Sequence, residues 1–585
     1  MVLLLKDFLS IFMNKKIFYT FFLLLFITNY SNLNANILDN KKRLIKNSNY
    51  FSNYLSGSVS LQKNDSQKAY SFFENIENLG IHHSEFNLKY VETLVNNGKI
   101  DEAYIFIRKL DTSYHSLYPF NLILFVHDFK KERYSRLKNY ISLPKQNLSD
   151  PLLLELYQNL GLWLDLSNKN IEELSEKISK SNSSFKNVSL TQKILINLFL
   201  DNQKNIDLYF NEISNKKELG RYNFFYLSYY LEKNNKEKIN QIINENLEIS
   251  SENLLFKQLF LDSRDNKFYK IDKFYKRRNI NHGLAELFYL FANFYQNYEQ
   301  VQISNFYLNL SEYLNPNFLS NKILKIENLI ILNNLEQSEK EIQVIEKLGK
   351  EFYWYANLTR LRFFPNINSE RQINMLEKFL ENNHFFISEK YFELANYLRN
   401  NKNYSKSIDL YQKSIISKKD TKESDWIYYY NLAISQERSG AWDYAEKSFL
   451  EALKISPKQP EVLNYLAYSW LEKKINLDKA KEMLVEAVNI SKGRGYILDS
   501  LGWAYFLLKD FEKAEEILQI AYEKEPSEAV IYDHYGDVLW TNGKEIQARY
   551  VWQNAVKLKN IEQDLKESIN KKIIFGLDNV IKNES

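Results

Sequence analysis

In the C-terminal third of the chain, apolar and polar residues follow the period of an amphipathic helix, and small residues mark a longer repeat. The first set of small residues, at steps of 35, 34 and 34 positions, comprises Ala445, Ala480, Ala514 and Ala548. A second set lies seven positions later and comprises Ala452, Ala487, Ala521 and Ala555. Gly502 and Gly536 each stand twelve positions before an alanine of the first set. This fixed period predicts a repeat architecture.

Helix packing explains why small and large residues alternate in this way. A pair of antiparallel helices can cross closely where their side chains are small, and large residues such as Tyr505 and Leu518 fill the space on either side. Pro526 cannot continue a helix, so it separates one pair from the next. One pair cannot bury its own apolar face, whereas stacked pairs form a continuous core. The clear repeats are 426–459, 460–494, 495–528 and 529–562, and the second contains one extra residue near Ile475–Leu477.

Upstream the pattern becomes weaker but stays helical. Ala69 and Ala103 are 34 positions apart, which predicts further repeats over residues 36–117. Residues 118–387 are predicted to form degenerate helix pairs, and residues 388–562 contain the clear repeats. In the tail, residues 563–585 have apolar residues at helical spacing and are predicted to form a capping helix.

The repeats resemble the tetratricopeptide repeat family, whose pattern of 34 residues has small residues at positions 8, 20 and 27 and proline at position 32. Pro457 and Pro526 occupy that last position. The resemblance implies an all-α solenoid, a superhelix of antiparallel helix pairs, that binds a peptide or protein partner in a concave groove. Carried onto this sequence, it implies partner-binding roles for Tyr430, Arg438, Asn464, Tyr468, Asp499, Trp503, Phe506, Asp533, Asp537 and Trp540.

Composition removes several classes of chemistry. The 77 basic and 73 acidic residues give a net charge of +4, which is no signature of a nucleic-acid partner. The chain contains no cysteine, which excludes disulfides, thiolate metal sites and lipid-modified cysteines. None of the seven histidines belongs to a zinc-binding HExxH helix, and no phosphate-binding loop or nucleophile motif occurs. We therefore expect no enzymatic activity, no catalytic residue, no metal and no cofactor.

The basic and aromatic stretch from Lys267 to Arg278 allows two interpretations. Lysines that alternate with rings could follow a nucleic-acid backbone or meet anionic lipid head groups. The simpler interpretation, which we favour, is an amphipathic helix with rings toward the core and lysines toward solvent.

The N-terminal segment has the features of an export signal. Lys15 and Lys16 precede an apolar run of 11 residues, Ile17–Ile27, and Ala35 ends a sequence that resembles a cleavage site. Eleven residues are too few to span a membrane as a helix, although the apolar residues before Met13 could extend the run into an uncleaved anchor. Residues 1–35 are therefore predicted to be a signal peptide or an N-terminal membrane anchor. The chain is predicted to be periplasmic, or anchored and facing the periplasm.

Together these features resemble exported Gram-negative tetratricopeptide proteins. They predict a non-catalytic scaffold or adaptor in the bacterial cell envelope, with a protein partner such as an envelope protease or an assembly complex. The alternative is an assembly factor for envelope polysaccharide or the outer membrane that binds glycan through aromatic groove residues such as Trp503.

Overall fold

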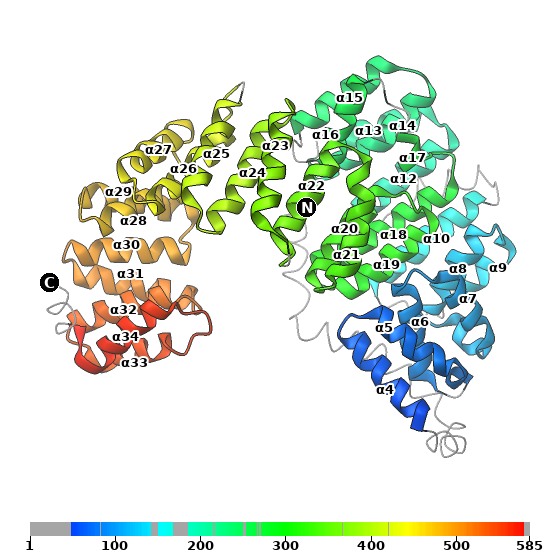
Figure 1. The fold of residues 1–585 in the computed structure, drawn as a ribbon, viewed down its shortest axis with the longest axis horizontal. Helices are drawn as coiled ribbons and strands as arrows, with labels where there is room; N and C mark the ends of the chain where they lie inside the picture. The colour runs from blue at the N-terminus through cyan, green and yellow to red at the C-terminus, as the bar shows by residue number, and fades with distance from the viewer. Residues whose placement is uncertain are drawn as a thin grey trace. The chain divides into compact units, whose positions relative to one another are not determined.

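The computed structural model describes residues 48–81, 83–141, 150–167, 185–213, 217–249, 253–265, 267, 271–365, 367–418 and 420–577. Residues 1–35, predicted to be a signal peptide or anchor, lie outside the described residues. Within the described ranges all regular structure is helical, and no β-strand occurs. The predicted all-α fold of consecutive helix pairs is confirmed (Figure 1).

The chain divides into two compact units, which we call unit 1 (residues 1–368) and unit 2 (residues 369–585). Unit 2 begins with α23 (Ser369–Glu381) and ends with α34 (Gln563–Phe575), and the short 3-10 helix η7 (Glu423–Asp425) precedes α26. Between them lie five helix pairs: α24 (Ile387–Asn400) with α25 (Tyr404–Ile416), α26 (Trp426–Arg438) with α27 (Trp442–Ile455), α28 (Pro460–Glu472) with α29 (Leu477–Ser491), α30 (Gly495–Leu507) with α31 (Phe511–Lys524), and α32 (Ala529–Thr541) with α33 (Glu545–Ala555). We call the first helix of each pair the A helix and the second the B helix.

Small residues sit at the helix crossings of unit 2, as the sequence predicts. All eight alanines of the two periodic sets are fully buried. At Gly502 a Cβ atom would lie 2.5 Å from Leu518 Cγ, and at Gly536 it would lie 2.2 Å from Trp552 Nε1. Such distances are far inside van der Waals contact, so the A and B helices of these pairs approach as closely as they do only because glycine has no side chain. The extra residue of the second repeat lies in the connection between α28 and α29.

Unit 1 contains helices of less regular length. Its elements are α4 (Ser48–Gln62), α5 (Ser66–Phe73), η1 (Glu74–Ile81), α6 (Ser84–Asn96), α7 (Ile100–Lys109), η2 (Thr112–Ser116), α8 (Phe120–Lys130), α9 (Tyr134–Ile141), α10 (Pro151–Ser167), α12 (Lys186–Leu200), α13 (Gln203–Ile213), η4 (Lys217–Tyr222), α14 (Asn223–Glu232), α15 (Lys236–Ile249), α16 (Leu254–Arg264), α17 (Ile271–Phe274), α18 (Ile280–Asn297), α19 (Val301–Leu314), α20 (Leu319–Ile331), α21 (Leu335–Ile345), η6 (Glu346–Leu348) and α22 (Lys350–Phe363).

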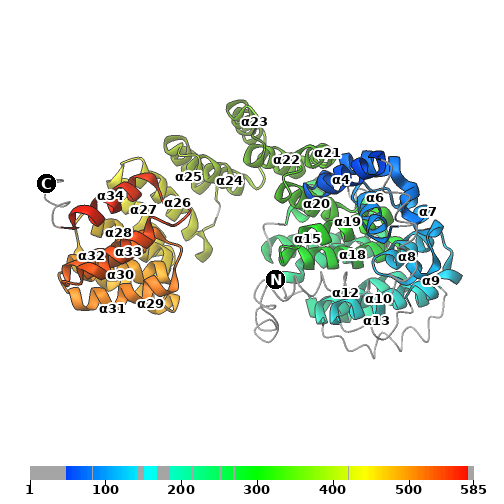
Figure 2. The same cartoon turned by 90° about the horizontal axis from the view of Figure 1, so that it is seen from below.

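Helices far apart in the sequence pack together in unit 1. The pair α18 and α19 contacts α6, α8, α10 and α12, in addition to its neighbours in the chain. A hydrogen bond of 3.1 Å between the hydroxyl groups of Tyr118 and Tyr307 spans 189 positions. One continuous apolar cluster extends from Ala69 to Ala356. Unit 1 therefore closes on itself around α18 and α19, and Figures 1 and 2 show α4–α6 beside α19–α21.

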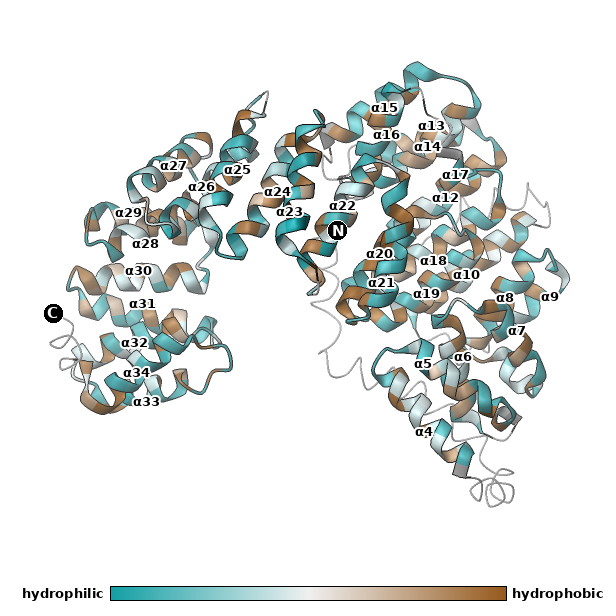
Figure 3. Cartoon of the chain, viewed as in Figure 1, coloured by the Kyte–Doolittle hydropathy of each residue, from teal (hydrophilic) through white to brown (hydrophobic). Residues whose placement is uncertain are grey.

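Figure 3 shows hydrophobic and hydrophilic residues interspersed along the described helices. In the stretch Lys267–Arg278 the described helix is only α17 (Ile271–Phe274), so the expected amphipathic helix is short. Phe274 and Tyr275 are buried whereas Lys273 and Lys276 are exposed, as expected for the rings and the lysines. Arg277 is buried too: it donates to the Leu198 carbonyl and pairs with Glu232. Across the described ranges, no helix is both long and apolar enough to cross a bilayer.

Two glycine substitutions test the crossing geometry. We expect Gly502→Ala to lower the stability of unit 2 by about 1–3 kcal/mol, because the added methyl group overlaps the fully buried Leu518. Gly161→Ala is the matched control in α10 of unit 1. There a Cβ atom meets nothing within 4 Å, and alanine favours a helix over glycine by about 1 kcal/mol. Calorimetric melting of both variants measures the effect, and a melting temperature of Gly502→Ala equal to that of the unchanged chain would contradict the packing described.

Candidate partner-binding surface

The residues implied by the family resemblance all lie on A helices of unit 2. Tyr430 and Arg438 belong to α26, and Asn464 and Tyr468 belong to α28. The helix α30 carries Asp499, Trp503 and Phe506, and α32 carries Asp533, Asp537 and Trp540. We call the side of unit 2 formed by these side chains the A-helix face. From α26 to α32 the side chains of the A-helix face become more buried and more acidic.

The first part of the A-helix face is aromatic and partly open. The ring of Tyr430 is half-buried and contacts the ring of Tyr465 edge-on, with 6.0 Å between centroids. Burial raises the pKa of the Tyr430 hydroxyl. Arg438 is exposed at the end of α26, next to Glu437, and Glu437 accepts a hydrogen bond from Tyr465. This part therefore presents rings together with an accessible cation.

The middle of the A-helix face, on α28, combines an amide with a phenol. Tyr468 is half-buried, and burial together with nearby carboxylates raises the pKa of its hydroxyl. Asn464 is also half-buried, and its Oδ1 accepts no hydrogen bond from any described residue. A covered polar atom without a partner costs about 1–3 kcal/mol, which favours a ligand that supplies a donor.

Next to α30 lies His534 of α32, a residue that the sequence interpretation did not select. His534, from α32, stacks on Trp503 at 4.2 Å between centroids, and its Nδ1 lies 2.9 Å from a carboxylate oxygen of Asp499. Trp503 also stacks on Phe506 at 4.8 Å. Trp503 and Phe506 remain half-buried, whereas Asp499 is buried. The structure thus gives Asp499 an intramolecular partner, and the rings form a stack.

The last part of the A-helix face is covered by α34. Lys572 of α34 is buried and donates to Asp533 at 2.8 and 2.9 Å and to Asp537 at 2.8 Å. Both aspartates are themselves buried. Trp540 stacks on Trp552 and lies under the guanidinium group of Arg549. Asp533 and Asp537 therefore hold α34 through Lys572, whereas Trp540 packs against α33.

The charges of this cluster do not balance. Asp499, Asp533 and Asp537 face two basic groups, His534 and Lys572. Burial and the neighbouring Asp533 raise the pKa of Asp537 to about 7. Burial lowers the pKa of His534, but the three carboxylates outweigh that effect and raise it above its usual value. Burial also disfavours the charged Lys572, and Asp537 and Asp533 reverse this, so its pKa is raised.

Of the two residues that the sequence interpretation missed, His534 could have been found in the sequence and Lys572 could not. His534 directly follows Asp533, and Asp499 lies one repeat earlier, so adjacent A helices bring them together. Lys572 has no such signal, because it lies outside the repeat period.

Among the described residues no set of three or more histidine, aspartate or glutamate side chains is arranged to hold a metal ion.

Comparison with known families supports the repeat assignment. Residues 383–560, which contain α24 to α33, match the family model described as tetratricopeptide repeat. No curated protein sequence matches the chain at a significant level.

Several solved structures are similar to part of the chain. MamA (residues 41 to the end) of Desulfovibrio magneticus RS-1 is 18% identical, with a TM-score of 0.27, over 30% of this chain and 97% of MamA. TTC0263 of Thermus thermophilus is 17% identical, with a TM-score of 0.29, over 32% of this chain and 100% of TTC0263. PilF of Pseudomonas aeruginosa is 15% identical, with a TM-score of 0.28, over 34% of this chain and 96% of PilF.

The pKa shifts predict how the C-terminal end of unit 2 responds to pH. The pKa of Asp537 rises from 3.8 to about 7 on folding, so between these values the folded state holds more protons and stability falls as pH rises. The raised pKa of His534 acts in the same direction: its contribution is complete below 6.5 and is lost as pH rises through the folded value. We therefore expect α32–α34 to be more stable at pH 6 than at pH 8.

Amide hydrogen exchange, corrected for the intrinsic effect of pH, measures this locally. A group whose pKa differs by one between the folded and unfolded states changes the protection by up to about tenfold. Asp537→Asn should reduce the pH dependence in α32–α34 to the part that His534 contributes, because it removes the titrating carboxyl. Glu512→Gln, an exposed acid on α31, is the control and should leave the dependence unchanged. Equal protection at both pH values in the unchanged chain would contradict the charge arrangement.

Proposed function

The chain is a tetratricopeptide repeat protein over residues 383–560, and on this premise we propose that unit 2 binds a protein or peptide partner across the A-helix face. Repeat arrays of this kind are protein-interaction scaffolds whose stacked helices present an extended surface. The proposed role is non-catalytic: the surface holds a partner and performs no reaction on it.

One observation supports this proposal most directly. The A-helix face between α26 and α30 keeps five side chains half-buried and one exposed, whereas α34 covers the face at α32. The accessible set is Tyr430, Arg438, Asn464, Tyr468, Trp503 and Phe506. Tyrosine, tryptophan and arginine are the residue types that contribute most to protein interfaces, because they bury much area and also carry a polar group. The binding region is thus proposed to extend over α26, α28 and α30.

A peptide or protein partner is favoured over glycan. A sugar ring needs a free aromatic face, but the ring of Trp503 already stacks on His534 and on Phe506. Asn464 Oδ1 and Trp503 Nε1 are an acceptor and a donor without described partners, and a polypeptide backbone offers a matching donor and acceptor. Glycan binding through the aromatic residues therefore remains the second hypothesis.

We further propose that the protein acts in the bacterial cell envelope. Support comes from the charged and apolar N-terminal segment that ends at Ala35. The partner would then be an envelope protein, such as a protease or an assembly complex, and residues 1–35 would attach the chain to the membrane if they are not cleaved.

Photo-crosslinking in intact cells tests the A-helix face. We expect benzoylphenylalanine at Arg438 and at Tyr468 to form adducts with the same protein, because both positions lie on the accessible part of the face. The matched control is Tyr444 on the B helix α27, which is 66% exposed and should give no such adduct. Mass spectrometry identifies the adducts. If Tyr444 captures that protein as well as Arg438 and Tyr468 do, the binding surface lies elsewhere.

The mature N-terminus tests export. We expect the chain purified from the envelope fraction to begin at Asn36, because cleavage would follow Ala35. N-terminal sequencing of the tagged protein measures this directly. An uncleaved chain found in membranes would indicate an anchor, and an uncleaved chain found in the cytoplasm would contradict the proposed location.

A further inference from the structure

Unit 1 contains a pocket that is separate from the A-helix face of unit 2. It has a volume of about 320 Å³, within the usual range for sites that bind small ligands or short peptide segments. One wall comes from α4, α5 and α6, and the other from α19, α20 and α21. Where the two walls meet, Asn334 Nδ2 donates to the Asn64 carbonyl at 3.3 Å. The pocket thus forms where unit 1 closes on itself.

Side-chain amides dominate the pocket. Eight of its sixteen lining residues are asparagine or glutamine, three are leucine, and no aromatic residue lines it within the described part of the chain. Each amide offers a donor and an acceptor side by side, which matches the N–H and C=O groups of a polypeptide backbone. Leu329 and Leu332 add apolar contact area on one wall.

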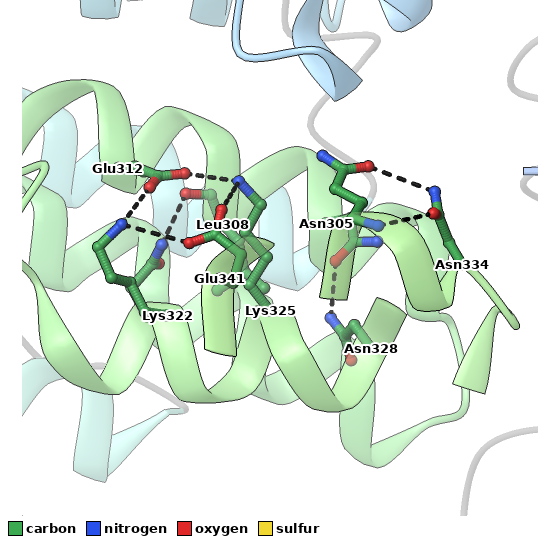
Figure 4. A network of polar contacts seen from close by, with 10 residues as sticks. Asn305, Leu308, Glu312, Lys322, Lys325, Asn328, Asn334 and Glu341 are labelled. Atoms are coloured by element: carbon green, nitrogen blue, oxygen red, sulfur yellow. Dashed lines mark hydrogen bonds and ion pairs between the residues drawn. The ribbon is translucent and has the colours of Figure 1, made fainter. Parts of the chain in front are cut away.

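One buried amide in the pocket lacks a partner. Asn309 is 4% exposed and lies on α19, and its Oδ1 accepts no hydrogen bond from the described residues. The nearby Asn328 donates through Nδ2 to Ser304 and to Asn305, although its own Oδ1 likewise accepts no hydrogen bond from the described residues. Figure 4 shows the side-chain amides of Asn305, Asn328 and Asn334 close together. Asn309 therefore retains hydrogen-bonding capacity at a wall of the pocket.

The lysines that line the pocket are already paired. Lys325 lies 2.6 Å from Glu312 and 3.2 Å from Glu341, and Lys322 joins the same two carboxylates, as Figure 4 shows. On the opposite wall, Lys89 pairs with Glu85 at 2.9 Å and donates to the hydroxyl groups of Tyr54 and Ser58. These three lysines and three glutamates compensate one another.

Glu92 is the remaining charge. It lines the pocket from α6, and no ion-pair partner for it occurs among the described residues. Glu92 is an exposed residue, and it borders the open space of the pocket. The surrounding protein nevertheless limits its hydration, and burial raises the pKa of its carboxyl to about 7. A cation placed in the pocket would remove this penalty.

We propose that the pocket binds an extended peptide segment with one lysine or arginine, whose cation pairs with Glu92 while its backbone lies along the amides of Asn305, Asn309 and Asn334. The three lysines and four glutamates in and around the pocket leave one negative charge, which favours a cationic ligand. The eight amide side chains that line the pocket favour the backbone of a polypeptide. The absence of an aromatic platform disfavours a sugar. This site uses no residue of the A-helix face, so it adds a second binding specificity to the chain.

Positional libraries of heptapeptides test the proposal on the full chain. The peptides are acetylated and amidated, the central position is lysine, arginine, norleucine or glutamate, and the other positions are mixed. Retention on the immobilised protein is measured for each pool. We expect the lysine and arginine pools to be retained at least tenfold better than the norleucine pool. Equal retention of the norleucine pool, or no retention of any pool, would overturn the proposal.

Three variants locate the binding. Glu92→Gln should reduce the preference for lysine and arginine to less than twofold, and Asn309→Ala should weaken retention of every pool. Glu327→Gln is the matched control, because Glu327 is an exposed acid on α20 outside the pocket whose pKa burial also raises. An unchanged preference in Glu92→Gln would refute the role of Glu92, whether or not the A-helix face binds its own partner.

A neutral oligosaccharide, chitotetraose, is the competitor. If it displaces the lysine pool and Glu92→Gln does not alter that displacement, the pocket is a glycan site and the peptide proposal is wrong. Arg438→Glu separates the two sites: it should weaken adducts at the A-helix face and leave peptide retention unchanged. Loss of peptide retention in Arg438→Glu would place the peptide on unit 2 instead.

Discussion

The close approach of paired helices is the constraint on which unit 2 depends. At Gly502 and Gly536 the neighbouring side chains of Leu518 and Trp552 occupy the space that a Cβ atom would need. Each pair is thereby held at a short distance, and the fully buried alanines repeat the same crossing along the array. Since every A helix has the same relation to its B helix, side chains at equivalent positions line up on one face. The binding surface is a geometric consequence of the crossing.

The way in which the array ends explains why the accessible face does not extend over all A helices. An array of stacked pairs leaves an apolar face open at its last repeat unless another element covers it. The helix α34 provides that cover, and Lys572 fixes it through Asp533 and Asp537. Buried charges contribute little net stability, but an α34 docked in a shifted position over α32 would leave carboxylates buried and unpaired. The contact therefore specifies where α34 docks more than it stabilises the unit.

Periodicity made the repeats predictable and made their exceptions unpredictable. The period located α26 to α33 and the alanines at their crossings, because equivalent positions have equivalent neighbours. The same logic placed Asp533 and Asp537 on an open groove, since it contains no information about Lys572, which lies outside the period. The closure of unit 1 could not be predicted from the period either. The hydrogen bond between Tyr118 and Tyr307 joins two segments that are not equivalent positions of a repeat. Where packing is not periodic, a single sequence does not indicate which helices meet.

Closure of unit 1 has a consequence for chemistry that an open array lacks. In unit 2 each residue of the A-helix face has neighbours from adjacent repeats, so polar groups such as Asp499 find partners close in the sequence order. In unit 1 the pocket is lined by two groups of helices more than 200 positions apart, α4–α6 and α19–α21. Lysines on each wall find carboxylates on their own wall, and the charges of Lys89 and Lys325 are compensated there. Glu92 receives no cation from the opposite wall, which is why closure of unit 1 yields a polar pocket with one uncompensated acid.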